Sequence, residues 1–204
     1  MFMKDWFFQP TQKEVWEKIV DKFGGEFIEF DRWSDFALKF KHKTWSVYID
    51  SYSRSHGQHT ASYTRIRTLI KDQSSLRFRA YLESLGGTIR KKMGMQDIRV
   101  GDARFDKQFI VKGNNKKLIR EFFTSDEIKK GLLNYPQPDL WLHDRMYLHG
   151  DKCPEGIAQV YLEAHGIDRD SINLLKCCEL FCAVLDGLEK LNLGFEDEHE
   201  FEID

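Results

Sequence analysis

The sequence has few cysteines and no long apolar run, and each shortage excludes a class of protein. Its four cysteines all lie in the C-terminal quarter. A secreted disulfide scaffold spreads its cysteines, so we expect free thiols in a reducing compartment. No run approaches the roughly 18 apolar residues of a membrane span. The first ten residues lack the apolar stretch and small-residue cleavage site of a signal peptide. We therefore expect a cytoplasmic protein with no membrane partner.

Motifs that hold phosphates, dinucleotides or catalytic serines are also missing. The sequence contains no G-x-x-x-x-G-K-[ST], no G-x-G-x-x-G and no G-x-S-x-G. We therefore expect no cofactor, and the sequence leaves open whether the chain is an enzyme.

Charge is unevenly distributed along the chain, although the net charge is only −2. Residues 39–120 hold 19 Lys and Arg against 6 Asp and Glu, a net charge of +13, and the remainder carries −15. Two interpretations follow. The acidic remainder neutralises the basic segment within the fold, which we favour, or the basic segment meets an anionic partner.

The hydrophobic pattern predicts an α+β fold. Apolar residues at helical spacing predict helices at 12–23, 115–133 and 171–191, and capping boxes start at Thr11 and Thr124. Extended segments are expected at 26–30, 36–40, 45–52, 63–70, 76–82, 97–100, 105–112, 140–143, 145–149 and 157–163. Short links between strands indicate antiparallel neighbours, so we expect an antiparallel meander with helices packed on one face, and a hairpin at 140–149. A short helix is expected within 84–93.

No linker rich in Pro, Gly or Ser divides the chain, so we expect one domain over residues 1–204, ending in an acidic tail at 195–204. The order helix then strands occurs twice, at 12–82 and 115–163. A subdivision near 113–115 into two loosely similar α+β subunits is therefore left open.

Two segments resemble a family of uncharacterised bacterial proteins. They are Tyr63-Thr-Arg-Ile-Arg67 and the block from Gly94 to Asn114, which reads GMQDIRVGDARFDKQFIVKGN. The resemblance covers about residues 10–145 and implies a bacterial, intracellular protein. It brings no activity, cofactor or residue role with it.

The strands of the middle third suggest a candidate binding face. Trp45, Val47, Ile49, Ile66, Ile70, Phe78 and Leu82 are expected on the core side, and Tyr48, Tyr63, Arg65, Arg67, Arg77, Arg79 and Tyr81 on the other. Arginine with tyrosine on a sheet is typical of single-strand nucleic-acid binders. The same composition suits a solvated or helix-covered face, which we favour.

Metal sites are weakly indicated. Asp97, Asp102 and Asp106 are candidate ligands for a divalent cation, yet their positions suit turns and backbone capping, and we favour that role. His56 and His59 lie in a polar loop, and Cys178 and Cys182 lie on an apolar helix. The paired spacing of a zinc site is absent, so no metal is expected.

From these observations we expect a non-enzymatic module that binds a partner or ligand. Two alternatives are kept. One is binding of single-stranded nucleic acid or another polyanion, and the other is a hydrolase or metal-dependent enzyme using His56 and His59 or the three aspartates. The partner is unknown, and a homo-oligomer is left open.

Overall fold

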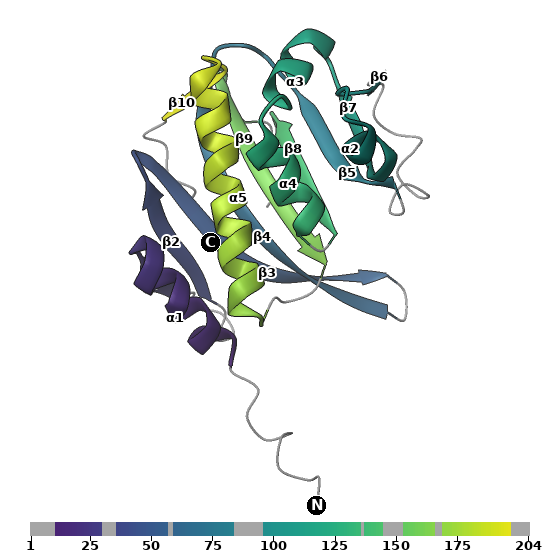
Figure 1. Ribbon diagram of the computed structural model, residues 1–204. Helices are drawn as coiled ribbons and strands as arrows, with labels where there is room; N and C mark the ends of the chain where they lie inside the picture. The colour runs from purple at the N-terminus through teal and green to yellow at the C-terminus, as the bar shows by residue number, and fades with distance from the viewer. Residues whose placement is uncertain are drawn as a thin grey trace, which may run out of the picture.

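The chain folds into an antiparallel sheet with helices packed on one face. The computed structural model describes residues 11–29, 36–56, 59–83, 96–135, 137–144, 153–165 and 169–196. In these ranges five helices lie against one sheet of ten strands (Figure 1). The α+β class expected from the sequence is confirmed. None of the described helices has the length and apolar content needed to cross a membrane.

Three of the described helices begin within one residue of the predicted starts, but the capping box expected at Thr124 is wrong, because the Ser125 hydroxyl caps that helix by accepting from the Ile128 N–H. They are α1 (Gln12–Phe23), α2 (Ala103–Gln108), α3 (Lys116–Phe122), α4 (Asp126–Asn134) and α5 (Ser171–Lys190). At the start of α1, the Thr11 hydroxyl accepts a hydrogen bond from the Glu14 backbone N–H at 3.2 Å, and the Glu14 carboxylate accepts one from the Thr11 backbone at 2.6 Å. This reciprocal pair is the predicted capping box. The helix expected within 84–93 lies outside the described residues.

The order of strands differs from a simple meander. The strands are β1 (Glu26–Glu29), β2 (Phe36–His42), β3 (Trp45–His56), β4 (His59–Asp72), β5 (Phe78–Leu82), β6 (Gln96–Ile98), β7 (Phe109–Gly113), β8 (Pro138–His143), β9 (Ile157–His165) and β10 (Gly194–Glu196). In space the order is β1-β2-β3-β4-β9-β8-β5-β7-β6, and β10 also pairs with β4. Only β1 to β4 form a meander.

The expected pairing of the strands at 63–70 and 76–82 is wrong. The edge of β4 that would receive β5 is occupied by β9, which pairs with it from Thr64 to Lys71. Strand β8 then separates β9 from β5. Residues 140–143 do not form the expected hairpin with 145–149. They belong to β8, which pairs with β5 on one side and with β9 on the other. Residues 145–149 lie outside the described part of the chain.

The segment at 105–112, expected to be extended, is half helix. The Asp102 carboxylate accepts hydrogen bonds from the backbone N–H groups of Arg104 and Phe105 at 3.0 and 3.1 Å, which starts α2. Phe105 points into the core as the buried residue of this short helix. The extended backbone begins at Phe109, where α2 ends.

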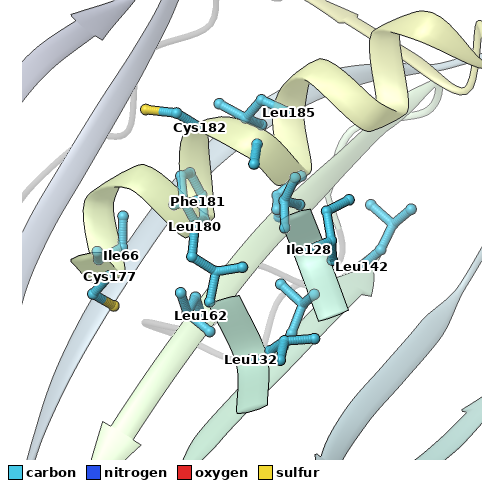
Figure 2. Packing of buried hydrophobic residues seen from close by; sticks show 14 of the residues in the cluster. Ile66, Ile128, Leu132, Leu142, Leu162, Cys177, Leu180, Phe181, Cys182 and Leu185 are labelled. Carbon is cyan, nitrogen blue, oxygen red and sulfur yellow. The ribbon is translucent and has the colours of Figure 1, made fainter. Parts of the chain in front are cut away.

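The core lies between the helices and one face of the sheet. Figure 2 shows α5 and α4 crossing the sheet, with Ile128 and Leu132 of α4 beside Leu180 of α5. The two helices approach closely at Gly131 of α4, where an added Cβ would lie 2.7 Å from a methyl carbon of Leu180. The six predicted core residues from Trp45 to Phe78 all belong to this cluster, and Leu82 packs against it. The side-chain alternation read from the sequence is therefore confirmed.

Candidate functional site

The face of the sheet opposite the core carries charged and aromatic side chains. By alternation and register, this polar face comprises Tyr48, Asp50 and Tyr52 of β3, Tyr63, Arg65 and Arg67 of β4, Gln159, Tyr161 and Glu163 of β9, Asp139 and Trp141 of β8, Arg79 and Tyr81 of β5, and Lys112 of β7. No described helix packs on it. It is therefore the first place to look for a binding site.

Most of the predicted binding residues on this face are buried. Arg65, Arg67 and Arg79 are at most 6% exposed, and Tyr48 and Tyr81 are at most 2% exposed. Tyr63 and Arg77 are partly exposed. The structure thus places these residues on the predicted side of the strands, but it does not offer their charged groups to solvent as an open binding sheet would.

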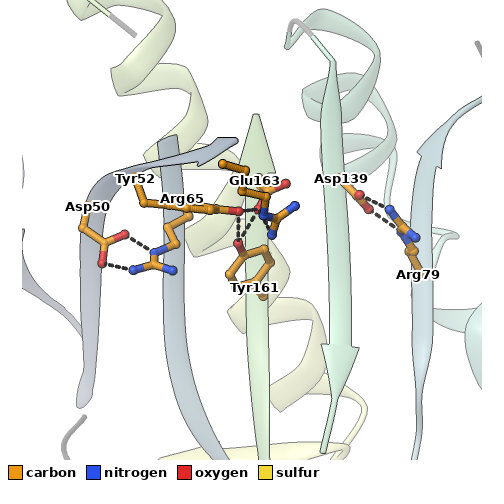
Figure 3. A network of polar contacts seen from close by, with 8 residues as sticks. Asp50, Tyr52, Arg65, Arg79, Asp139, Tyr161 and Glu163 are labelled. Carbon is orange, nitrogen blue, oxygen red and sulfur yellow. Dashed lines mark hydrogen bonds and ion pairs between the residues drawn. The ribbon is translucent and has the colours of Figure 1, made fainter. Parts of the chain in front are cut away.

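The carboxylate of Asp50 holds two of the arginines. Arg65, directly opposite Asp50 on β4, donates from Nε and Nη2 to the two carboxylate oxygens, the second bond measuring 2.8 Å. Arg67 donates from Nη2 to Asp50 Oδ2 at 2.8 Å. Figure 3 shows the parallel bonds between Arg65 and Asp50. Burial lowers the pKa of the Arg67 guanidinium, and the charge of Asp50 opposes that effect.

A second carboxylate, Glu163, collects two tyrosine hydroxyls. Tyr52 and Tyr161 both donate to Glu163 Oε2, and their oxygens lie 3.3 Å apart (Figure 3). Arg54 approaches the same oxygen at 3.5 Å. Burial, with the charge of Glu163, raises the pKa of the Tyr161 hydroxyl, so this hydroxyl stays protonated and acts as a donor.

Arg79 forms a third buried pair farther along the sheet. It donates from Nε to Asp139 Oδ1 at 2.8 Å and from Nη2 to the other oxygen. Its guanidinium lies 3.9 Å from the ring centroid of Trp141 and 4.7 Å from that of Tyr81. Burial raises the pKa of Asp139, and the bonds from Arg79 oppose the rise. The arginine is thus fixed by a bidentate bond and by stacking.

Charges from the acidic remainder partly neutralise the basic segment. Asp139 and Glu163 come from outside residues 39–120 and contact Arg79 and Arg54. On the helix side, Lys43 lies 2.7 Å from Asp186 of α5. The internal neutralisation favoured from the sequence therefore operates at these pairs.

Two of the three aspartates considered as metal ligands accept backbone hydrogen bonds. Asp102 caps α2, and Asp106 accepts from the N–H groups of Val100 and Gly101 at 2.9 and 3.0 Å. Asp97 extends into solvent, with 76% of its side chain exposed. In the ranges that the structure describes, no three His, Cys, Asp or Glu side chains converge as a metal site would require. Cys178 and Cys182 are buried in α5, and the backbones of His56 and His59 pair at the end of the β3–β4 hairpin.

A cavity of about 560 Å³ opens at the far edge of the sheet, between β5, β6, β7 and α2. We call it the edge cavity. Its described lining is Tyr81, Glu83, Asp97, Ile98, Arg99, Ala103, Asp106, Lys107, Phe109, Ile110, Val111 and Lys112. The volume is within the range of about 300–1,000 Å³ that small-molecule sites occupy.

Tyr81 and Gln159 of the polar face each bury a polar group that has no hydrogen-bond partner among the described residues. One is the hydroxyl of Tyr81, which is among the residues that line the edge cavity. The other is the side-chain amide of Gln159, which is 0% exposed. A buried polar group left without a partner costs about 1–3 kcal/mol.

Sequence reasoning selected Tyr81 for the face but passed over Lys112, Gln159 and Ile110. Lys112 alternates with apolar residues in Ile110-Val-Lys112, a signal that places it on the face opposite Val111. Nothing local in the sequence marks the cavity itself, because it forms where β5 pairs with β7, and the paired residues Leu82 and Phe109 are 27 positions apart in the chain.

Comparison with known proteins leaves the chain without an assigned family. No protein-family model matches it, and no curated protein and no solved structure matches it. The resemblance carried by the residues around Tyr63 and by the block from Gly94 to Asn114 therefore stays a prediction.

Proposed function

We propose that the chain is a non-enzymatic ligand-binding module and that the edge cavity holds its ligand. The observation that carries this proposal is the Tyr81 hydroxyl, which is buried and lacks a hydrogen-bond partner among the described residues, while Tyr81 is one of the residues that line the cavity. A ligand atom in the cavity would satisfy the hydroxyl and recover its desolvation cost.

The binding of single-stranded nucleic acid has weaker support. Open-sheet binders present cations to phosphates and aromatic faces to bases. Here Arg65 already bonds both oxygens of Asp50, and Arg79 both oxygens of Asp139. Releasing either guanidinium to a phosphate would leave a buried carboxylate without its partner, which is costly.

The hydrolase or metal-enzyme alternative is also less well supported. Asp102 and Asp106 already accept two backbone hydrogen bonds each, so their oxygens are held in structural roles. These contacts favour binding over catalysis as the use of this edge of the sheet.

A pair of tryptophan variants tests whether the cavity is the binding site. Ala103 lines the cavity at the exposed start of α2, whereas its exposed neighbour Arg104 does not line it. Ala103→Trp should therefore fill the cavity, and Arg104→Trp is the matched control. Thermal unfolding is measured with a panel of organic acids, nucleosides, sugars and amino acids.

We expect at least one compound to raise the Tm of the wild type and Arg104→Trp but not that of Ala103→Trp. A ligand present at one hundred times its Kd adds about 2.7 kcal/mol to stability, which is several degrees for a chain of this size. Equal shifts in both tryptophan variants would place binding elsewhere, and a panel without any shift would count against the proposed function.

A further inference from the structure

Lys112 presents a poorly compensated ammonium group to the edge cavity. Its side chain is 15% exposed, and its ion-pair partner among the described residues is Asp97, at a long 3.5 Å. That carboxylate is 76% exposed, so water screens its charge. The ammonium has three donors, and this single contact leaves it able to bind a further acceptor.

Lys112 and Tyr81 come from adjacent strands on the same face. In the antiparallel register Tyr81 is opposite Ile110, and Lys112 is opposite Arg79. Lys112 and Tyr81 are therefore diagonal neighbours, whose separation is about 7–8 Å. One atom between them can contact both side chains. Arg79 does not compete for that atom, because Asp139 holds it.

The remaining charges of the lining lie toward solvent or are engaged. Asp97 and Glu83 are exposed acids, and Lys107 is an exposed base. Arg99 donates to the backbone carbonyl of Asp106 at 2.9 Å. Asp106, partly buried as Lys112 is, accepts hydrogen bonds from the N–H groups of Val100 and Gly101. Lys112 and the Tyr81 hydroxyl are thus the polar groups of the described lining that lie away from solvent and retain capacity to donate, and the exposed charges at the rim are screened.

We infer that the ligand of the edge cavity is a small organic oxyanion. Its carboxylate or phosphate oxygens accept hydrogen bonds from Lys112 Nζ and from the Tyr81 hydroxyl, and its apolar body lies along Ile110, which is opposite Tyr81 on the same face. A charged oxygen is the acceptor that an ammonium group binds most strongly. This inference rests on the proposed function and names the chemical class of ligand.

Isothermal titration with three probes of one shape tests the class. Benzoate carries a carboxylate, phenyl phosphate carries a phosphate, and benzamide is the neutral counterpart of benzoate. The variants are Lys112→Met, which keeps the apolar stem, and Tyr81→Phe, which keeps the ring against Arg79. Lys190→Met on α5 and Tyr63→Phe on β4 are matched controls outside the cavity.

We expect at least one anion to bind at least about tenfold more tightly than benzamide, because a hydrogen bond to a charged group is the stronger kind. Lys112→Met should weaken anion binding about 10- to 100-fold and Tyr81→Phe about 3- to 10-fold, while the two controls bind as the wild type does. Comparing benzoate with phenyl phosphate shows which oxyanion the site prefers.

Equal affinity for benzamide and both anions, or unchanged affinity in Lys112→Met, would overturn the inference. So would a failure of both anions to bind while another compound of the wider panel shifts the wild type and not Ala103→Trp. In that last case the ligand-binding function would stand and the oxyanion class would fall. The two failures are therefore distinguishable.

Discussion

Asp50 and Arg65 lie directly opposite each other on β3 and β4 and share two parallel hydrogen bonds, while Arg67 takes a third bond to the same carboxylate. All three side chains are at most 7% exposed. One carboxylate therefore compensates the charges of two buried guanidinium groups. Both arginines lose a partner if Asp50 is changed, whereas Asp50 keeps one partner if either arginine is changed.

Removing the carboxylate charge should destabilise the protein more than removing one arginine. Asp50→Asn leaves two buried guanidinium groups without their shared counter-charge, so we expect a loss of about 3–5 kcal/mol in urea unfolding. Arg65→Leu leaves Asp50 still bonded to Arg67, so its loss should be smaller. Glu179→Gln, at the exposed Lys22 pair, should cost less than about 1 kcal/mol. A loss in Asp50→Asn no greater than in Arg65→Leu would contradict this account.

The buried amide of Gln159 predicts a substitution that does not destabilise. Gln159→Met keeps the length of the side chain and removes two buried polar atoms that have no partner in the described part of the chain, so the free energy of unfolding should stay the same or rise by about 1 kcal/mol. That rise corresponds to about 2–4 °C in Tm.

Thr68 is the control for this thermal measurement, because its buried polar group has a hydrogen-bond partner and that of Gln159 has none among the described residues. Its buried hydroxyl donates to the Ser46 carbonyl at 2.7 Å, so Thr68→Val breaks a satisfied bond and should lower stability by about 1 kcal/mol. A Tm of Gln159→Met that falls as far as that of Thr68→Val would show that the amide has a structural role.

Cys153 should react slowly with thiol reagents. Burial, with the nearby charge of Asp144, raises the pKa of the Cys153 thiol from 9.0 to about 11. Near neutral pH its thiolate fraction, and hence its labelling rate by a disulfide reagent, should be about 100-fold below that of a free thiol with the ordinary pKa. Labelling as fast as glutathione would contradict this environment.

The same raised pKa gives stability a pH dependence with a definite sign. Above pH 9 the thiol of the unfolded chain ionises while the thiol of the folded protein stays protonated. The contribution of Cys153 to the free energy of unfolding is therefore complete below pH 9 and is lost as pH rises toward about 11. In urea unfolding, the free energy of unfolding of Cys153→Ser should fall less steeply with pH between 9 and about 11 than that of the wild type. An equal slope in both proteins would assign the fall to other groups.

The two faces of the middle strands could be predicted because alternation is a local property. Val47 and Ile49 face the core and Asp50 faces away from it, as their positions in the chain require. Burial of the arginines could not be predicted in this way. Arg79 pairs with Asp139, sixty residues later, and nothing near Arg79 in the sequence indicates that partner.

For the candidate site, too, local sequence identified individual residues but not the long-range pairing that brings them together. Tyr81 was identified from its own strand, and Asp97 and Asp106 were identified as carboxylates, although for a metal. The cavity that they line exists because β7 pairs with β5 and β6, and because Asp102 starts a helix beside them. Short-range propensity favoured an extended Phe105–Phe109 segment, and the capping carboxylate overrode it.

The insertion of β9 and β8 between β4 and β5 affects how the chain assembles during synthesis. When residues up to Leu82 have emerged from the ribosome, β4 and β5 both present edges whose partners have not yet been made. Strand β5 gains its partners β7 and β8 by residue 143, but the free edge of β4 waits for more than seventy further residues, until Ile157–His165 arrives and closes the sheet. Unpaired edges invite pairing with other chains, so this interval is the period of greatest exposure to misassembly.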